Sequence, residues 1–206
     1  MSPPKPLIDP QTVPGFLDAD EGAALAQAAE IGAQRGDLAE IGAYCGRSTL
    51  YLGAVAQHAG RRVLSVDHHR GSEEHQPGEA FYDPALWDAD ARAVDSLAVF
   101  RRTLRRAGLE ETVFALVGQS EAAAAMIAPQ LGCLFLDGGH SLAQALADYR
   151  AWAGKLVSGG ILAIHDVFAD PAQGGRPPYE VATRAAASGL FAPWSQTGSL
   201  AVFVRL

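Results

Sequence analysis

The fold of the chain is best predicted from one ten-residue stretch, Glu40-Ile41-Gly42-Ala43-Tyr44-Cys45-Gly46-Arg47-Ser48-Thr49. A short apolar run precedes them and a helix-forming run follows, so we expect a tight turn between a strand and a helix. Gly42 and Gly46 let the backbone approach a ligand closely, and the helix N-terminus beyond them favours an anion. The spacing is GxxxG rather than the GxGxxG of the dinucleotide fingerprint.

Strands and helices alternate on both sides of this turn. This alternation predicts an α/β fold, a parallel sheet covered by helices on both faces, with a C-terminal hairpin on one edge. We expect an N-terminal arm and helix over 1–36, followed by a single ligand-binding domain over 37–206. Residues 68–92 are predicted to be irregular and residues 93–107 helical. The predicted strands cover 38–43, 62–67, 112–117, 133–137 and 161–165, with two more near 190–195 and 199–205.

Composition limits the class of partner. The chain has 206 residues, a net charge of -7 and 49% hydrophobic residues, which suits one packed domain and disfavours nucleic acid or an anionic membrane surface. Cys45 and Cys133 are too few for a disulfide framework and indicate reduced thiols in the cytoplasm. The chain shows neither a secretory signal nor an apolar run long enough for a membrane span. We therefore expect a small-molecule substrate, with a homodimer left open.

Acidic residues close several predicted strands, and ligands bind beyond the carboxyl ends of parallel strands. Asp67 ends the strand that follows the Glu40 motif, where a carboxylate can accept hydrogen bonds from both hydroxyls of a ribose. Asp137 and the pair His165-Asp166 end two later strands. The sequence therefore predicts one acidic binding edge.

Four motifs carry a resemblance to a known family. The stretch from Glu40 to Ser48 resembles the first motif of class I S-adenosylmethionine-dependent methyltransferases, and GAYCGRS (42–48) is especially close to the loop of catechol O-methyltransferase. A branch of the class with DGxH and HD motifs is an equally good match. The resemblance implies a Rossmann-like, doubly wound, seven-stranded sheet, mostly parallel with the last strand antiparallel. The other three motifs follow in the family's order: LVGQSE (116–121), LFLDGGH (134–140) and GGILAIHDV (159–167).

The resemblance implies a site for S-adenosylmethionine. Gly42 and Gly46 would leave room for the methionine part, and Ser48 would bind its carboxylate. Glu40 would orient the loop or meet the amino group, and Asp67 would hold the ribose hydroxyls. Ser120, with Gln119 or Glu121, would border the adenine. The same strand ends add three residues to the predicted cofactor site, namely Tyr44, His68 and Asp137.

The resemblance also implies a metal and a base. Catechol-type enzymes hold a divalent cation at positions that correspond here to Asp137, His165 and Asp166. Two carboxylates suit Mg²⁺, whereas an imidazole favours Mn²⁺, Fe²⁺ or Zn²⁺. Alternatively the metal has been lost and the aspartates only cap backbone N–H groups. His140 stands where the family has its catalytic lysine, and with an ordinary pKa of about 6.5 it can act as the base. Its alternative role is to cap the helix that begins at Ser141.

These features predict O-methylation of a small hydroxylated molecule, with His140 as base and Asp137 in the catalytic centre. One alternative is a nicotinamide-dependent oxidoreductase, which the GxxxG spacing disfavours. The other is a non-catalytic cofactor-binding or assembly protein, favoured by three aromatic residues in the polar segment 68–92, which predict a lid or a partner surface. The spacing of His and Glu residues there matches no metal signature. The three aromatic residues are Phe81, Tyr82 and Trp87.

Overall fold

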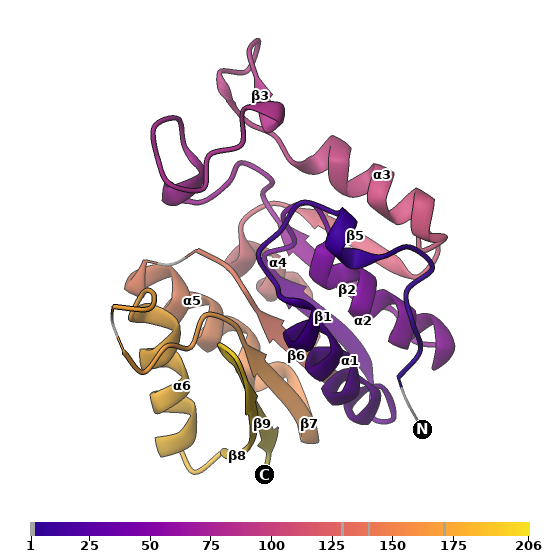
Figure 1. The fold of residues 1–206 in the computed structure, drawn as a ribbon. Coiled ribbons are helices and arrows are strands. Elements are labelled where there is room, and N and C mark those ends of the chain that lie inside the picture. The colour runs from indigo at the N-terminus through magenta and orange to yellow at the C-terminus, as the bar shows by residue number, and fades with distance from the viewer. Residues whose placement is uncertain (1–2, 129, 140, 171) are drawn as a thin grey trace.

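The computed structural model describes residues 3–128, 130–139, 141–170 and 172–206, in which strands and helices alternate (Figure 1). The main strands are β1 (Asp37–Ile41), β2 (Val63–Asp67), β5 (Val113–Val117), β6 (Leu131–Leu136), β7 (Leu156–Ile164), β8 (Phe191–Thr197) and β9 (Leu200–Arg205). The helices are α1 (Ala19–Ala33), α2 (Arg47–His58), α3 (Leu97–Ala107), α4 (Ser120–Met126), α5 (Leu142–Trp152) and α6 (Pro177–Ala187). Short 3₁₀ turns cover Pro10–Thr12, Glu73–His75, Pro84–Leu86 and Ala153–Lys155.

The main strands form one sheet in the order β5-β2-β1-β6-β7-β9-β8. The five strands from β5 to β7 are parallel, and β9 is antiparallel to both of its neighbours. The predicted seven-stranded, mostly parallel, doubly wound sheet with an antiparallel last strand is therefore confirmed. The strand order reverses between β1 and β6, and this is where open α/β sheets bind ligands.

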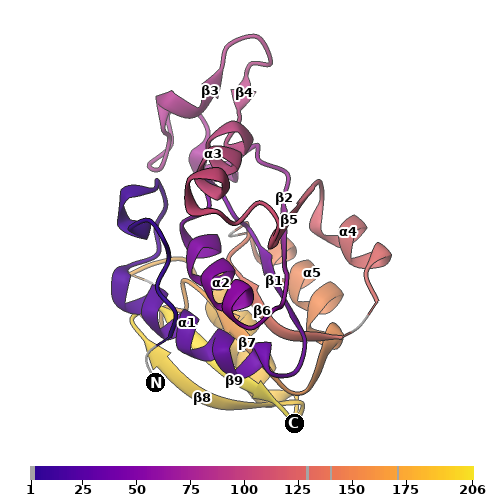
Figure 2. The same cartoon turned by 90° about the vertical axis from the view of Figure 1, so that its right-hand side faces the viewer.

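Helices cover both faces of the sheet and create two apolar cores. Figure 2 shows α1 and α2 on one side of the strands and α4 and α5 on the other. Strand β6 supplies both cores, because successive side chains of a strand point to opposite faces. Cys133 and Phe135 pack with the α1–α2–α3 side, whereas Leu134 and Leu136 pack with the α4–α5–α6 side. All six residues of β6 are buried, as expected for a central strand covered on both faces.

The segment between β2 and α3 is more ordered than the sequence predicts. Strands β3 (Trp87–Asp88) and β4 (Ala93–Val94) pair as a short antiparallel ribbon, and the segment lies above the sheet in both views (Figures 1 and 2). The predicted helix over 93–107 is wrong in its first turn, since α3 begins at Leu97. Asp95 accepts a hydrogen bond from the Leu97 backbone N–H, so a polar cap separates the ribbon from the helix.

Other details of the fold concern the cysteines and the helix lengths. Cys45 and Cys133 are free and buried, and burial raises the pKa of each thiol to about 12. Such thiols are protonated and inert at neutral pH. Within the described ranges, every helix is too short or too polar to cross a lipid bilayer.

Candidate cofactor and catalytic site

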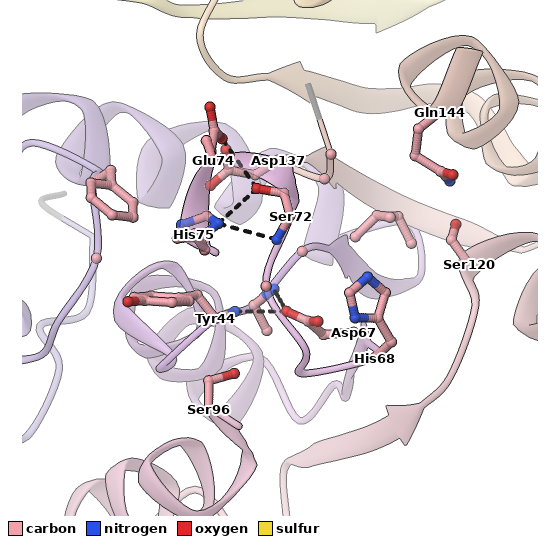
Figure 3. A pocket seen from close by; sticks show the side chains of 18 of the residues that line it. Tyr44, Asp67, His68, Ser72, Glu74, His75, Ser96, Ser120, Asp137 and Gln144 are labelled. Carbon is pink, nitrogen blue, oxygen red and sulfur yellow. Dashed lines mark hydrogen bonds between the residues drawn. The ribbon is translucent and has the colours of Figure 1, made fainter. Parts of the chain in front are cut away.

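A cavity of about 810 Å³ lies at the carboxyl ends of β1, β2, β5, β6 and β7 (Figure 3). The strand ends meet here because the five strands are parallel, so the predicted motifs converge. Glu40, Gly46 and Glu121 are not among the lining residues, whereas Asp166 is. His140 lies outside the described residues. The predicted cofactor residues that line the cavity are Gly42, Tyr44, Ser48, Asp67, His68, Gln119, Ser120 and Asp137.

Asp67 shapes the turn between β1 and α2. Its Oδ2 accepts hydrogen bonds from the backbone N–H groups of Ala43 (2.9 Å) and Tyr44 (2.8 Å), as Figure 3 shows for Tyr44. Its Oδ1 accepts from the His69 backbone N–H at 2.6 Å. Gly42 has φ +88°, and a Cβ there would overlap the Asp137 carbonyl. Asp67 and Gly42 therefore hold the loop close to the neighbouring strand end.

Glu40 lies beneath this loop rather than in the cavity. It is fully buried, and its carboxylate accepts hydrogen bonds from the hydroxyls of Thr49 (2.6 Å), Ser65 (2.6 Å) and Ser48 (2.9 Å). Burial raises the pKa of Glu40 to about 7, although the three hydroxyls oppose that shift. The geometry corresponds to the predicted loop-orienting role. Glu40 is not among the residues that line the cavity, and its alternative contact with a cofactor amino group stays a prediction.

The β5–α4 corner forms the opposite wall. The Ser120 hydroxyl accepts a hydrogen bond from the Trp152 indole N–H at 2.8 Å. Asp148, which the sequence motifs did not include, is a buried lining residue. Burial raises the pKa of its carboxyl group, and its Oδ1 accepts a hydrogen bond from the Gln144 side-chain amide at 3.1 Å. Asp148 lies four residues before Trp152 on the inner face of α5. A carboxylate on an otherwise apolar helix face is the sequence feature that could have identified it. Glu121 is exposed and does not line the cavity, although it accepts a hydrogen bond at 3.4 Å from Gln144, which does.

A buried chain of charged groups runs behind the Asp137 wall. His165 is 3% exposed, and its Nδ1 lies 3.0 Å from Asp137 Oδ1 while its Nε2 lies 3.0 Å from Glu21 Oε2. Burial alone would lower the pKa of His165, but Asp137 and Glu21 outweigh burial and raise it to about 11. Burial alone would raise the pKa of Glu21, but hydrogen bonds from His165 and Ser199 lower it to about 2. The raised pKa of His165 therefore favours a protonated ring between the two carboxylates.

The structure brings the three predicted metal ligands together. Among the described parts of the chain, Asp137, His165 and Asp166 are the one group of three or more His, Cys, Asp or Glu side chains whose ligand atoms all lie within 4.8 Å of one another. A metal needs a ring nitrogen with a lone pair. Nε2 of His165 faces Glu21, whereas Nδ1 lies beside Asp137 and Asp166, on the side of the candidate ligand group. A divalent cation at these three residues stays a prediction.

Aromatic rings from three separate segments form the mouth of the cavity. The Tyr44 and His75 rings stack with centroids 5.0 Å apart, and Phe16 packs against Tyr44 (5.6 Å) and edge-on against Phe81 (5.1 Å). Phe16 is 50% exposed and Phe81 is 48% exposed. We call these four residues the aromatic mouth. Of the aromatic residues predicted as a lid or partner surface, Tyr82 and Trp87 pack against the core instead.

The acidic character of the cavity continues at this mouth. Seven carboxylates of the described residues line the cavity: Glu73, Glu74 and Glu79 from the segment that also supplies His75 and Phe81, and Asp67, Asp137, Asp148 and Asp166. Arg47 also lines it, and its guanidinium donates to the backbone carbonyls of Val13 (2.9 Å) and Leu17 (3.1 Å). The cavity therefore favours cationic or neutral ligands over anions.

Comparison with known proteins identifies the family. Residues 39–167 match the sequence profile of a family described as "Methyltransferase domain", which is more than half of the chain. The chain belongs to this methyltransferase family. Together with the sheet order, the match confirms the resemblance to class I S-adenosylmethionine-dependent methyltransferases.

Solved structures, among them two O-methyltransferases, share the fold. The O-methyltransferase NovP is 19% identical over 90% of this chain and 79% of its own, with a TM-score of 0.65. The O-methyltransferase from Bacillus cereus in complex with SAH is 17% identical over 95% of this chain and 86% of its own, with a TM-score of 0.62. Cofactor-bound Rv0187 from MTB is 18% identical over 94% and 83%, with a TM-score of 0.67. At these identities the likeness shows the fold alone.

Proposed function

We propose that this methyltransferase transfers the methyl group of S-adenosylmethionine to a hydroxyl of a small planar molecule held at the aromatic mouth. The observation that carries the proposal is a single cavity with two chemically distinct halves. One half is formed by the glycine-bordered loop and Asp67, and the other opens between exposed aromatic rings. A methyltransferase needs such an arrangement, because cofactor and acceptor must meet in line.

The cofactor half suits each part of S-adenosylmethionine. We assign the ribose hydroxyls to Asp67 and the adenine to the wall of Gln119 and Ser120, next to His68. The methionine carboxylate then lies at the N-terminus of α2 near Ser48, where backbone N–H groups lack helical partners. The loop conformation supports this assignment, since Gly42 and Gly46 both have positive φ and leave the turn without a bulky side chain at these positions.

The charge of the cavity suits the reaction. The cofactor carries a sulfonium and an ammonium, and Asp137 and Asp166 line the wall on the other side of the Gly42 turn. In the proposed step the acceptor oxygen forms a bond to the methyl carbon as the carbon–sulfur bond breaks, and sulfur leaves as a neutral thioether. The hydroxyl proton passes to a base, which we assign to His140, because Gly139 and Ser141 on either side of it in the chain line the cavity.

The mouth supports a particular kind of acceptor. Stacked rings bind planar groups through their faces, and glutamates at the rim disfavour an acceptor that carries a carboxylate or phosphate. We therefore expect neutral or cationic hydroxylated aromatic compounds to react faster than acidic ones.

The test uses methyl-labelled S-adenosylmethionine and matched pairs of acceptors. Each pair keeps the ring and hydroxyl and differs in an amine or a carboxylate, and a third member replaces the hydroxyl by an aromatic amine. We expect labelled ether product from the neutral and cationic phenols. His140→Ala should lose turnover while keeping cofactor affinity, and His58→Ala, at the far end of α2, should lose neither. Labelling at nitrogen alone, or binding without transfer to any acceptor or cell extract, would overturn the proposal.

A further inference from the structure

We propose that Asp148 on helix α5 determines which purine the cofactor site accepts, and that its carboxylate takes a hydrogen bond from the 6-amino group of the adenine. The inference rests on the proposed function only in placing the adenine at the wall of Gln119 and Ser120. The sequence motifs that predict the cofactor site do not include Asp148, which comes from a different element of the fold.

Asp148 combines deep burial with access to the cavity. The residue is 3% exposed, yet it lines the cavity together with Gln119, Ser120 and Gln144. A Cβ at Gly138 would lie 2.8 Å from Asp148 Oδ2, so the glycine leaves room for the carboxylate at the cavity wall. A carboxylate is rarely buried to this extent unless hydrogen bonds satisfy it. Its partners therefore show what else it can bind.

The hydrogen bonds that lead to Asp148 have a fixed direction. The Trp152 indole N–H can only donate, and it donates to the Ser120 hydroxyl at 2.8 Å. Burial raises the pKa of Asp148, whereas its hydrogen bond with the Ser120 side chain lowers it. A hydroxyl has one proton, and that bond uses it. The chain of donors from Trp152 therefore ends on the Asp148 carboxylate as its acceptor.

Gln144 occupies one further position on the carboxylate. Its side-chain amide donates to Asp148 Oδ1 at 3.1 Å. An ionised carboxylate has about four lone-pair positions, of which Gln144 and Ser120 use two. The remaining positions can only accept, so a group that completes the site from the cavity must be a hydrogen-bond donor.

The placement of these partners directs a nucleoside base to Asp148. In Figure 3, Ser120 and Gln144 lie on one side of the cavity, and Asp67 lies beyond His68 on the other. With the ribose assigned to Asp67 and the base assigned to the wall at Ser120, an edge of the base faces the element that carries Asp148 and Gln144.

An acceptor at this wall distinguishes between purines. Adenine has an amino group at position 6, which donates hydrogen bonds, whereas a 6-oxo purine has a carbonyl there, which accepts them. A carbonyl facing the Asp148 carboxylate would bring two acceptors together in a buried site and leave both unsatisfied. Sites built to bond a donor discriminate strongly against analogues that lack it. Asp148 therefore selects adenosine over inosine in the cofactor.

The test compares S-adenosylhomocysteine with two analogues, in which the 6-amino group is replaced by a carbonyl or by hydrogen. Dissociation constants are measured by calorimetry with the full chain. We expect the wild type to bind S-adenosylhomocysteine at least about tenfold more tightly than either analogue. In Asp148→Asn the ratio between the amino and carbonyl ligands should fall to within about threefold, because an amide can donate as well as accept. Equal affinities for the three ligands in the wild type would overturn the inference without any variant.

Glu121→Gln is the matched control. Glu121 also accepts a hydrogen bond from Gln144, but it is exposed and does not line the cavity. We expect this variant to keep the wild-type ratio, and loss of discrimination in Glu121→Gln instead of Asp148→Asn would overturn the inference.

The same ligands separate this result from the proposed function. Discrimination between the ligands without methyl transfer to any acceptor would reject the proposed function and support the role of Asp148. Methyl transfer without discrimination would support the proposed function and overturn the role of Asp148. Failure of all three ligands to bind would overturn both.

Discussion

Two glutamates are buried at the same end of the sheet, yet their ionisation differs. Glu40 lies among the hydroxyls of Ser48, Thr49 and Ser65, and its pKa is raised to about 7. Glu21 faces the His165 imidazolium and the Ser199 backbone, and its pKa is lowered to about 2. Burial acts in the same direction on both carboxyl groups. The difference therefore comes from the partners, which are neutral in one case and cationic in the other.

This contrast separates two walls of the cavity. The wall at the Gly42 turn rests on a network of hydroxyls and backbone groups. The wall at Asp137 rests on the ion chain from Glu21 through His165 to Asp137. The same glutamate-to-glutamine change should therefore have different consequences behind the two walls.

The largest effect is expected for Glu21→Gln. Removing one carboxylate leaves the buried His165 charge partly unpaired, which costs about 3 to 5 kcal/mol in proteins. Urea unfolding measures the loss in the free energy of unfolding. Glu30→Gln, on the same helix, is the matched control and should stay within about 0.5 kcal/mol of wild type. Equal losses in the two variants would contradict the ion chain.

The corresponding substitution Glu40→Gln should lower the free energy of unfolding by a smaller amount. The amide that replaces the carboxylate can still bond the surrounding hydroxyls, because a hydroxyl donates or accepts. We expect a loss of about 1 kcal/mol, the size of a single hydrogen bond, again by urea unfolding. A loss at Glu40 larger than that at Glu21 would reverse the comparison between the two glutamates.

The pH dependence should separate the two groups by sign. Relative to the ordinary value of 4.5, the raised pKa of Glu40 gives stability that is present below pH 4.5 and lost as the pH rises through about 7. The lowered pKa of Glu21 gives stability that is present above pH 4.5 and lost as the pH falls through about 2. For each group, the free energy of unfolding changes by at most about 1.4 kcal/mol per pH unit. Unfolding curves of wild type and both variants across this range should diverge in opposite directions, and parallel curves would reject the assignment.

The smallest effect is expected at the aromatic mouth. Phe81→Ala removes one exposed ring and should weaken the proposed acceptor binding by about 0.5 to 1.5 kcal/mol, with little change in cofactor affinity or stability. Phe114→Ala is the control, because Phe114 is equally exposed at 49% but lies on β5 outside the cavity. Acceptor KM values for both variants provide the measurement. An unchanged KM in Phe81→Ala would remove this ring from the acceptor site.

The sequence could predict the fold and the cofactor side of the cavity for a physical reason. Parallel strands bring their carboxyl ends to one edge, so Gly42, Asp67 and Asp137 had to converge once the strands were recognised. Hydrophobic periodicity located the strands, but it extended the helix at 93–107 too far, because Val94 suits a strand as well as a helix face.

Contacts between distant segments could not be predicted in this way. Glu21 is 144 residues from His165, and its place three residues after Asp18 already had a local explanation as a capping box. Phe16 in the N-terminal arm meets Phe81 in the segment after β2 only because both segments fold over the same cavity. Such pairs depend on how elements dock, which residue spacing does not encode.

Calorimetry with S-adenosylmethionine tests the central claim, that the cavity at Asp67 is the cofactor site. The wild-type chain is compared with Asp67→Ala and with Asp20→Ala, an exposed aspartate of α1 outside the cavity. We predict binding to the wild type and to Asp20→Ala, and at least a tenfold weaker affinity in Asp67→Ala, which corresponds to about 1.4 kcal/mol. No binding to the wild type, or equal affinity in the two variants, would contradict the account.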